Sequence, residues 1–214
     1  MSKEAVLNCF KATRVVAIIR GMDPEICVKL SQAYHDGGIR LVEVTFDQTG
    51  DPAKTTTAIA AIRAAFPDMH VGAGTVLTEA QLQSAIDAGA EFMVTPSVNV
   101  TLIRKANAAG LATMPGALTP TEIVTAHEAG ADCVKIFPVR VLGPAYIKDV
   151  LAPLKHIKLL AVGGVSPDNA ADYLKAGCCG VAASGSLVNK EWIAAGEYGK
   201  IAEVARALIA TCNR

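Results

Sequence analysis

The chain has 214 residues, of which 51% are hydrophobic and 19% charged, a composition typical of globular proteins rather than disordered ones. Its 20 basic and 20 acidic side chains cancel, so charge favours neither nucleic acid nor a membrane surface as a partner. No apolar run approaches the roughly 20 residues of a membrane-spanning helix. Six cysteines without a Cys-x-x-Cys motif predict free thiols and a cytoplasmic location.

A short local pattern recurs along the chain and predicts the order of its elements. A helical stretch ends in a small or acidic residue followed by glycine, and an apolar run rich in strand formers begins shortly afterwards. Because glycine enters the left-handed conformation without strain, each such glycine predicts the end of a helix and the approach of a strand. These glycines are Gly37, Gly89, Gly110, Gly130 and Gly177.

Eight apolar runs in chain order predict strands. They lie at residues 15–20, 41–46, 70–76, 92–96, 112–116, 133–138, 158–163 and 180–184. Helical segments lie between them, and the residues before the first strand predict a short N-terminal helix that covers the bottom of the structure. Capping signals occur at Asp23-Pro24, Thr78-Glu79, Thr119-Pro120 and Ser166-Pro167.

Eight strands that alternate with helices in a chain of this length predict an α/β fold, a parallel (β/α)8 TIM barrel, with residues 1–214 forming a single domain. The main rival is an open doubly wound sheet. The first strand ends and the next turn begins in IIRGMDP, which lacks the glycine fingerprint of a dinucleotide-binding turn, so this rival is disfavoured.

Lys135 interrupts the apolar run 133–138. Alternation along a strand places Lys135 on one face and both Val134 and Ile136 on the other. The Val/Ile face should meet the surrounding helices, so we expect Lys135 to point into the barrel. Burial lowers the pKa of a lysine and leaves more free amine at neutral pH, which is the form that attacks a carbonyl to make a Schiff base.

Glu43 interrupts the run 41–46 in the same way. Alternate strands of a TIM barrel contribute to one interior layer, so Glu43 on the second strand and Lys135 on the sixth can meet across the interior. Two interpretations remain open at this point. The pair is either a catalytic amine with an acid/base carboxylate, or a buried ion pair that only fills the barrel.

Further candidates lie at the carboxyl ends of strands, where TIM barrels hold their active sites. Arg20 ends the first strand and Thr75 the third, and both side chains suit a substrate carboxylate, although an ordinary solvated role for Arg20 stays open. Gly163-Gly164 and Ser184-Gly185-Ser186 end the seventh and eighth strands, where such barrels commonly bind phosphate. A Gly-Gly pair is equally compatible with a tight turn.

No set of His, Asp and Glu residues has the spacing of metal ligands, and no Gly-x-Ser-x-Gly motif favours acyl transfer. We therefore expect no metal, and no cofactor other than a covalent Schiff base on Lys135.

Eight segments between Val15 and Val188 together resemble the family of 2-keto-3-deoxy-6-phosphogluconate (KDPG) and 4-hydroxy-2-oxoglutarate (KHG) aldolases. They are VEVTF, VGAGTV, VTP, MPGALTPTE, VKIFP, GPAYIK, VGGVSPDN and SGSLV. The resemblance implies a metal-free class I aldolase that is a homotrimer, with Lys135 as the Schiff-base lysine and Glu43 as its acid/base. Pro96 of VTP and Phe137 of VKIFP join the expected substrate-binding residues.

Three positions depart from the family pattern. Asp47 stands where many members have Arg or Thr after the second strand. In part of the family an arginine at the end of the first strand replaces the second-strand arginine, and Arg20 matches it. Val162 in AVGG replaces the threonine of the frequent PTGG and resembles the 6-phosphogalactonate branch. Ser184-Gly185 transposes the usual Gly-Ser.

We therefore expect an aldolase that cleaves KDPG to pyruvate and glyceraldehyde 3-phosphate, with a small 2-keto acid as its partner and no nucleic acid or membrane. The same chemistry on 2-keto-3-deoxy-6-phosphogalactonate (KDPGal) or on KHG is one alternative. A phosphate-binding barrel isomerase or epimerase, in which Lys135 is only an ion-pair partner, is the alternative from another class. A non-catalytic binding barrel has no need for an inward Lys135 and Glu43.

Overall fold

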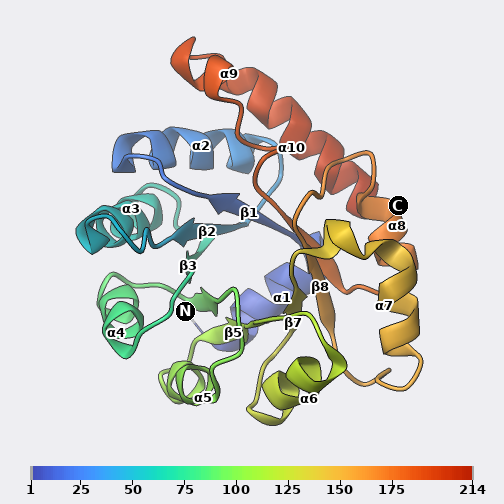
Figure 1. Cartoon of the computed structure of the whole chain (residues 1–214). Coiled ribbons are helices and arrows are strands. Elements are labelled where there is room, and N and C mark those ends of the chain that lie inside the picture. Colours follow the sequence, from blue (N-terminus) through green and yellow to red (C-terminus); the bar gives the residue numbers. More distant parts are fainter. Residues whose placement is uncertain (1, 214) are drawn as a thin grey trace.

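The computed structural model describes residues 2–213. Its strands form one parallel sheet in the order β5-β4-β3-β2-β1-β9-β8-β7-β6, and Figure 1 shows the helices around it. The strands are β1 (Val15–Ile19), β2 (Leu41–Thr45), β3 (His70–Gly74), β4 (Phe92–Val94), β5 (Ala112–Met114), β6 (Gly116–Ala117), β7 (Val134–Ile136), β8 (Leu159–Val162) and β9 (Gly180–Ala183).

The predicted fifth strand is divided in two at Pro115. Its first part, β5, pairs with β4, and its second part, β6, pairs with β7. Proline has no N–H to donate to a strand ladder, so the ladder is interrupted there. The segment 113–115 still contacts the next strand: the Cys133 N–H donates to the Thr113 carbonyl oxygen (3.3 Å) and the Lys135 N–H to the Pro115 carbonyl oxygen (2.8 Å), which closes the barrel between β5 and β7. The fold is therefore the predicted (β/α)8 barrel, with its fifth strand interrupted.

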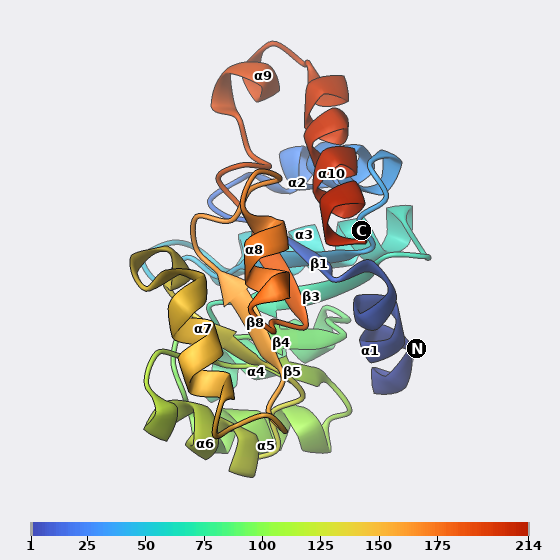
Figure 2. The ribbon, with the colours of Figure 1, turned by 90° about the vertical axis from the view of Figure 1, so that its right-hand side faces the viewer.

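Helices cover the outside of the barrel and one of its ends. Figure 2 shows α1 on one side of the barrel and the turn that precedes α7 on the opposite side. The helices are α1 (Lys3–Thr13), α2 (Pro24–Asp36), α3 (Pro52–Ala65), α4 (Glu79–Asp87), α5 (Val100–Ala108), α6 (Pro120–Glu128), the 3-10 turn η1 (Val139–Val141), α7 (Gly143–Leu151), α8 (Ala170–Lys175), α9 (Lys190–Ala194) and α10 (Tyr198–Cys212). None of these helices combines the length and apolarity needed to cross a membrane.

Most of the predicted helix ends are confirmed, and two differ. Thr78 and Thr119 each form a capping box, with Gln81 and Glu122 respectively. Gly37, however, ends α2 in the right-handed region, and the next residue, Gly38, takes the left-handed conformation with φ of 91°. The helix predicted to open at Ser166-Pro167 begins only at Ala170, because those two residues belong to the turn before it.

The barrel interior is apolar toward its bottom. Residues that include Val16, Leu41, Phe92 and Leu160 form an inner cluster, which is separate from the larger cluster between strands and helices. The predicted N-terminal helix, α1, adds Phe10 to this inner cluster and so plugs the barrel. A Cβ at Gly180 would lie 2.5 Å from the Phe10 ring, so the plug requires glycine at that strand position.

Candidate active site

A cavity of about 500 Å³ opens at the C-terminal ends of the strands, where the sequence analysis expects the site. Nine of the ten predicted site residues line it, and the tenth, Glu43, is buried on the interior face of β2. The lining residues predicted from the sequence are Arg20, Thr75, Pro96, Lys135, Phe137, Gly163, Gly164, Ser184 and Gly185. Residues from strands far apart in the chain are therefore brought to one cavity.

Lys135 lies at the middle of β7 and points inward. Its neighbours Val134 and Ile136 pack in the outer cluster against the helices, as the alternation predicts, while Lys135 is only 4% exposed. Its Nζ lies 4.8 Å from the centroid of the Phe137 ring. Burial lowers the pKa of Lys135 below its ordinary value, and the nearby charge of Glu43 opposes this shift.

Glu43 is 1% exposed, and neither of its carboxyl oxygens has a hydrogen-bond partner in the part of the chain that the structure describes. Burial raises its pKa above the ordinary value, while Lys135 and then Arg20 pull the pKa down. The neighbouring β3 makes room for this side chain with a glycine. A Cβ at Gly74 would lie 2.0 Å from Glu43 Oε1, so no larger residue fits there without moving the carboxyl group.

Lys135 and Glu43 influence each other's pKa, yet no hydrogen bond or ion pair joins them. A buried ion pair that merely fills the barrel would bring the two charged groups into contact. Instead, burial lowers the pKa of the Lys135 amine, which favours its neutral form, and raises the pKa of the Glu43 carboxyl group above its ordinary value. An unprotonated amine suits attack on a carbonyl, and an unpartnered carboxyl group suits proton transfer.

Arg20 and Thr75 follow directly after β1 and β3 at the rim of the cavity. Thr75 has a left-handed backbone, with φ of 54°, which is rare for a β-branched residue. The Gln48 side chain holds it there by donating a 2.9 Å hydrogen bond to the Thr75 carbonyl oxygen. Gln81 donates in turn to the Gln48 side-chain oxygen at 3.0 Å, which connects the capping box of α4 to this arrangement.

The loops after β8 and β9 lie side by side. Gly163 and Gly164 both have positive φ angles, of 106° and 78°, which favour glycine at each position. The Ser186 hydroxyl donates a 2.8 Å hydrogen bond to the carbonyl oxygen of Val165 and so ties the two loops together. No helix begins within the second loop, since α9 starts only at Lys190.

Asp47, the departure on the second strand, organises its own loop. Its Oδ1 accepts hydrogen bonds from the backbone N–H and the hydroxyl of Thr49, both at 2.9 Å. These hydrogen bonds lower the pKa of Asp47 below its ordinary value. The carboxylate therefore stabilises the turn after β2.

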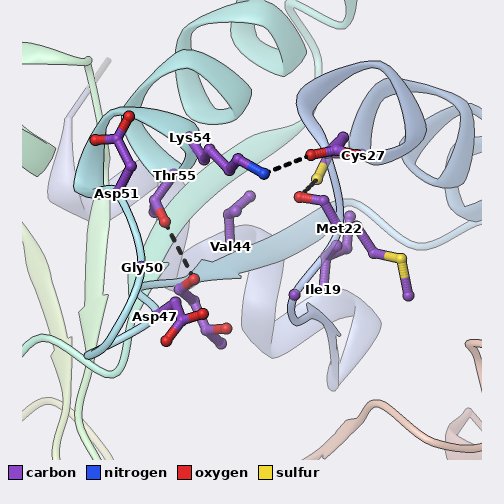
Figure 3. A pocket seen from close by; sticks show the side chains of 12 residues that line it. Ile19, Met22, Cys27, Val44, Asp47, Gly50, Asp51, Lys54 and Thr55 are labelled. Atoms are coloured by element: carbon purple, nitrogen blue, oxygen red, sulfur yellow. Dashed lines mark hydrogen bonds and ion pairs between the residues drawn. The ribbon is translucent and has the colours of Figure 1, made fainter.

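A second cavity, of about 180 Å³, lies between the ends of β1 and β2 and the starts of α2 and α3 (Figure 3). Several of its polar groups pair with one another. Lys54 bonds to Asp23 at 2.9 Å, and the Thr55 hydroxyl donates to the Thr45 carbonyl oxygen at 3.2 Å. It contains neither Lys135 nor Glu43, so we assign the candidate site to the larger cavity.

The cavity also contains residues that the sequence analysis missed. Arg140 and Ser166 line it from the segments after β7 and β8. The signal that could have indicated Arg140 was a cation five positions after Lys135, whereas the sequence analysis gave Ser166 only as a helix-capping residue. Among residues 2–213, no group of three or more His, Cys, Asp or Glu side chains is placed to hold a metal ion.

The family model and the similar proteins all point to one family of aldolases. The chain matches the family described as KDPG and KHG aldolase over residues 6–204. It is 38% identical over 175 residues to the 2-dehydro-3-deoxy-6-phosphogalactonate aldolase of Escherichia coli (strain K12), covering 81% of this chain and 83% of that protein. It is 35% identical over 201 residues to the 2-dehydro-3-deoxy-phosphogluconate aldolase of Treponema pallidum (strain Nichols), covering 92% of each.

Solved structures agree with the fold. A cube-shaped protein cage designed by fusing symmetric oligomeric domains superposes with a TM-score of 0.84 at 34% identity, over 92% of this chain and 71% of that one. The KDPG aldolase of Legionella pneumophila, with pyruvate captured as a covalent carbinolamine intermediate, superposes with a TM-score of 0.84 at 26% identity, over 94% and 96%.

Proposed function

Because the chain belongs to the KDPG and KHG aldolase family, and is therefore an aldolase and a lyase, we propose that it acts through a Schiff base on Lys135. One observation carries the proposal. Lys135, a buried lysine with a lowered pKa, lines the cavity, and Glu43, a buried glutamate with a raised pKa, lies in the same barrel interior close enough for each charge to shift the other's pKa. The covalent carbinolamine captured in the Legionella enzyme supports this chemistry.

In the proposed mechanism, the Lys135 amine attacks the C2 carbonyl of a 2-keto acid, and loss of water from the carbinolamine leaves an iminium. Glu43 removes the proton of the C4 hydroxyl, directly or through water. The C3–C4 bond then breaks, an aldehyde leaves, and the electron pair moves to the iminium to form an enamine. Glu43 returns its proton to C3, and hydrolysis releases pyruvate and the free amine of Lys135.

The other site residues take binding roles in this proposal. Arg20 and Thr75 hold the substrate carboxylate, and Pro96 completes the wall beside it. Phe137, within 4.8 Å of Lys135 Nζ, shields the iminium from water. The substrate's far end meets the loops that contain Gly163, Gly164, Ser184 and Gly185, where backbone N–H groups can approach a phosphate.

We propose a phosphorylated 2-keto-3-deoxy acid as the substrate. KDPG would give pyruvate and glyceraldehyde 3-phosphate. Its epimer KDPGal is the second candidate, favoured by the 38% identity to the Escherichia coli enzyme named for that compound and by Val162 in AVGG. Cleavage rates of KDPG, KDPGal and KHG, with pyruvate detected by a coupled reaction, decide among the three.

We also propose that the protein is a homotrimer. Several large apolar side chains are exposed near the C-terminal ends of the strands, among them Leu77, Leu118, Leu142 and especially Val141, which is 73% exposed. The Tyr146 hydroxyl bonds to the Leu118 carbonyl oxygen and brings two of these segments together. Exposed apolar clusters commonly mark protein interfaces. The similar chain from the cage assembled from symmetric oligomeric domains supports association.

Borohydride trapping tests the Schiff base directly. Reduction in the presence of pyruvate should inactivate the protein and add a pyruvate-derived mass to the peptide that contains Lys135, as measured by mass spectrometry. Lys135→Ala should abolish turnover and trapping. Lys148→Ala, which removes an exposed lysine on α7, is the matched control and should retain both. A label on another lysine, or full activity after Lys135→Ala, would contradict the proposal.

A further inference from the structure

Arg140 lies in η1, directly after the strand that carries Lys135, and lines the same cavity as the loops after β8 and β9. Its side chain runs along the surface of Gly164. A Cβ at Gly164 would lie 3.0 Å from both Cβ and Cδ of Arg140. The missing side chain at Gly164 therefore leaves room for Arg140 to lie against the glycine loop.

The charge of Arg140 is not neutralised by the protein. Arg40 and Arg63 form ion pairs with Asp68 and Glu91. Arg140 forms no ion pair or side-chain hydrogen bond with any residue between 2 and 213, and its side chain is exposed at the cavity. An unpaired guanidinium beside backbone N–H groups is well suited to an anion, because it offers two parallel donors to one oxyanion group.

Two arginines line the cavity from the ends of different strands, and neither forms an ion pair or side-chain hydrogen bond within residues 2–213. Arg20 follows β1 and Arg140 follows β7, with β9 and β8 between these strands in the sheet. Arg20 is close enough to affect the pKa of both Lys135 and Glu43, whereas Arg140 is not among the groups that do so. Arg20 thus acts electrostatically on Lys135 and Glu43, whereas Arg140 lies against the glycine loop that follows β8.

We propose that Arg140 binds the terminal phosphate of the substrate and makes the protein select phosphorylated 2-keto acids over unphosphorylated ones. The proposal rests on the aldolase function proposed above. The carboxylate end of such a substrate is held near Lys135, so its phosphate reaches the far loops, where Arg140 supplies the positive charge that the neutral Gly163, Gly164 and Ser184 do not.

The test compares kcat/KM for KHG with kcat/KM for whichever of KDPG and KDPGal the native protein cleaves faster. Arg140→Ala should lower kcat/KM for the phosphorylated substrate at least about tenfold, as expected for losing a charge-assisted contact, and lower that for KHG far less. Arg140→Lys should recover part of the loss by restoring the charge without the two-pronged donor. Arg104→Ala, which removes an exposed arginine on α5, is the matched control and should leave the ratio unchanged.

Inorganic phosphate gives a second measurement. It should inhibit KHG cleavage competitively in the native protein and at least about tenfold more weakly in Arg140→Ala. Borohydride trapping with pyruvate checks that each variant keeps an intact Lys135 site. Equal losses on both substrates, or unchanged phosphate inhibition, in a variant that still traps pyruvate would overturn the role of Arg140. Failure of the native protein to trap pyruvate would instead refute the proposed aldolase function.

Discussion

At the scale of single residues, burial distinguishes Lys135 and Glu43 from most of the other charged side chains. Each is at most 4% exposed, and burial disfavours the charged form of both. Their mutual attraction opposes these shifts without a direct contact. The arrangement leaves more of the Lys135 amine unprotonated, and so able to attack a carbonyl, than in an ordinary lysine, and it raises the pKa of the Glu43 carboxyl group above its ordinary value.

Replacing Glu43 separates adduct formation from proton transfer. Glu43→Gln keeps the shape of the side chain, so the pyruvate adduct on Lys135 should still form. Exchange of the pyruvate methyl protons with deuterated water, followed by NMR, should slow by roughly 10²–10⁴-fold, the usual contribution of a positioned general base. Glu128→Gln, an exposed residue on α6, serves as the control and should exchange at the native rate.

The native exchange rate should also fall as the pH is lowered, because protonation removes the base form of Glu43. Since the pKa of Glu43 is raised, this fall should begin at a higher pH than for a glutamate of ordinary pKa. A Glu43→Gln variant that exchanges at the native rate would mean that another group, or water alone, transfers the proton.

At the scale of elements, α1 closes the bottom of the barrel and is tied to β3 through His70. The His70 Nδ1 lies 3.2 Å from Glu91 Oε1, and Arg63 forms an ion pair with the same carboxylate. Cys9 of α1 and then Glu91 raise the pKa of His70 to about 9. A protonated His70 thus connects α1 to the segment that leads into β4, on the side of the barrel away from the candidate site.

The His70 contacts predict a stability that depends on pH. A folded-state pKa raised to about 9 from 6.5 contributes stability that is complete below about pH 6.5 and is lost as the pH rises through about 9. Allowing for solvent screening, the loss should be about 1 kcal/mol. The difference in free energy of unfolding between the native protein and His70→Gln, measured with urea at pH 6 and pH 10, should shrink by this amount. A constant difference would contradict the prediction.

At the scale of the whole molecule, the packed apolar core and the candidate site lie at opposite ends of the barrel. One end is filled by apolar side chains and closed by Phe10 of α1, while the other end holds the cavity with Arg20 and Arg140. The exposed apolar side chains gather toward the cavity end. Association through that end would cover them and place the rim of the cavity close to a neighbouring chain.

The proposed homotrimer is tested by mass in solution. Light scattering coupled to size-exclusion chromatography should give three times the 22.2 kDa of one chain. Val141→Asp places a charge at the most exposed apolar position and should shift the protein toward monomer, because burying an unpaired charge is costly. Ala60→Asp, on the exposed face of α3, should leave the mass unchanged. A native mass of one chain would contradict the trimer.

Most of what the sequence predicted about the fold and the site came from periodic patterns within single elements. The alternation around Lys135 and Glu43 determined that both side chains face inward, and the recurring glycines determined the order of strands and helices. These are local properties of the chain, so they can be read without knowing how the elements pack. The position of the cavity then followed, because parallel barrels place the carboxyl ends of all strands on one side.

Only the tertiary structure decided which residues actually meet. The left-handed Thr75 is held by Gln48, the space for Glu43 depends on Gly74 of the neighbouring strand, and Arg140 lies against Gly164 from a different loop. Whether Lys135 and Glu43 touch was equally undetermined, since it depends on the width of the closed barrel. Such contacts join residues distant in the chain, and their free energies depend on packing and burial that no local pattern encodes.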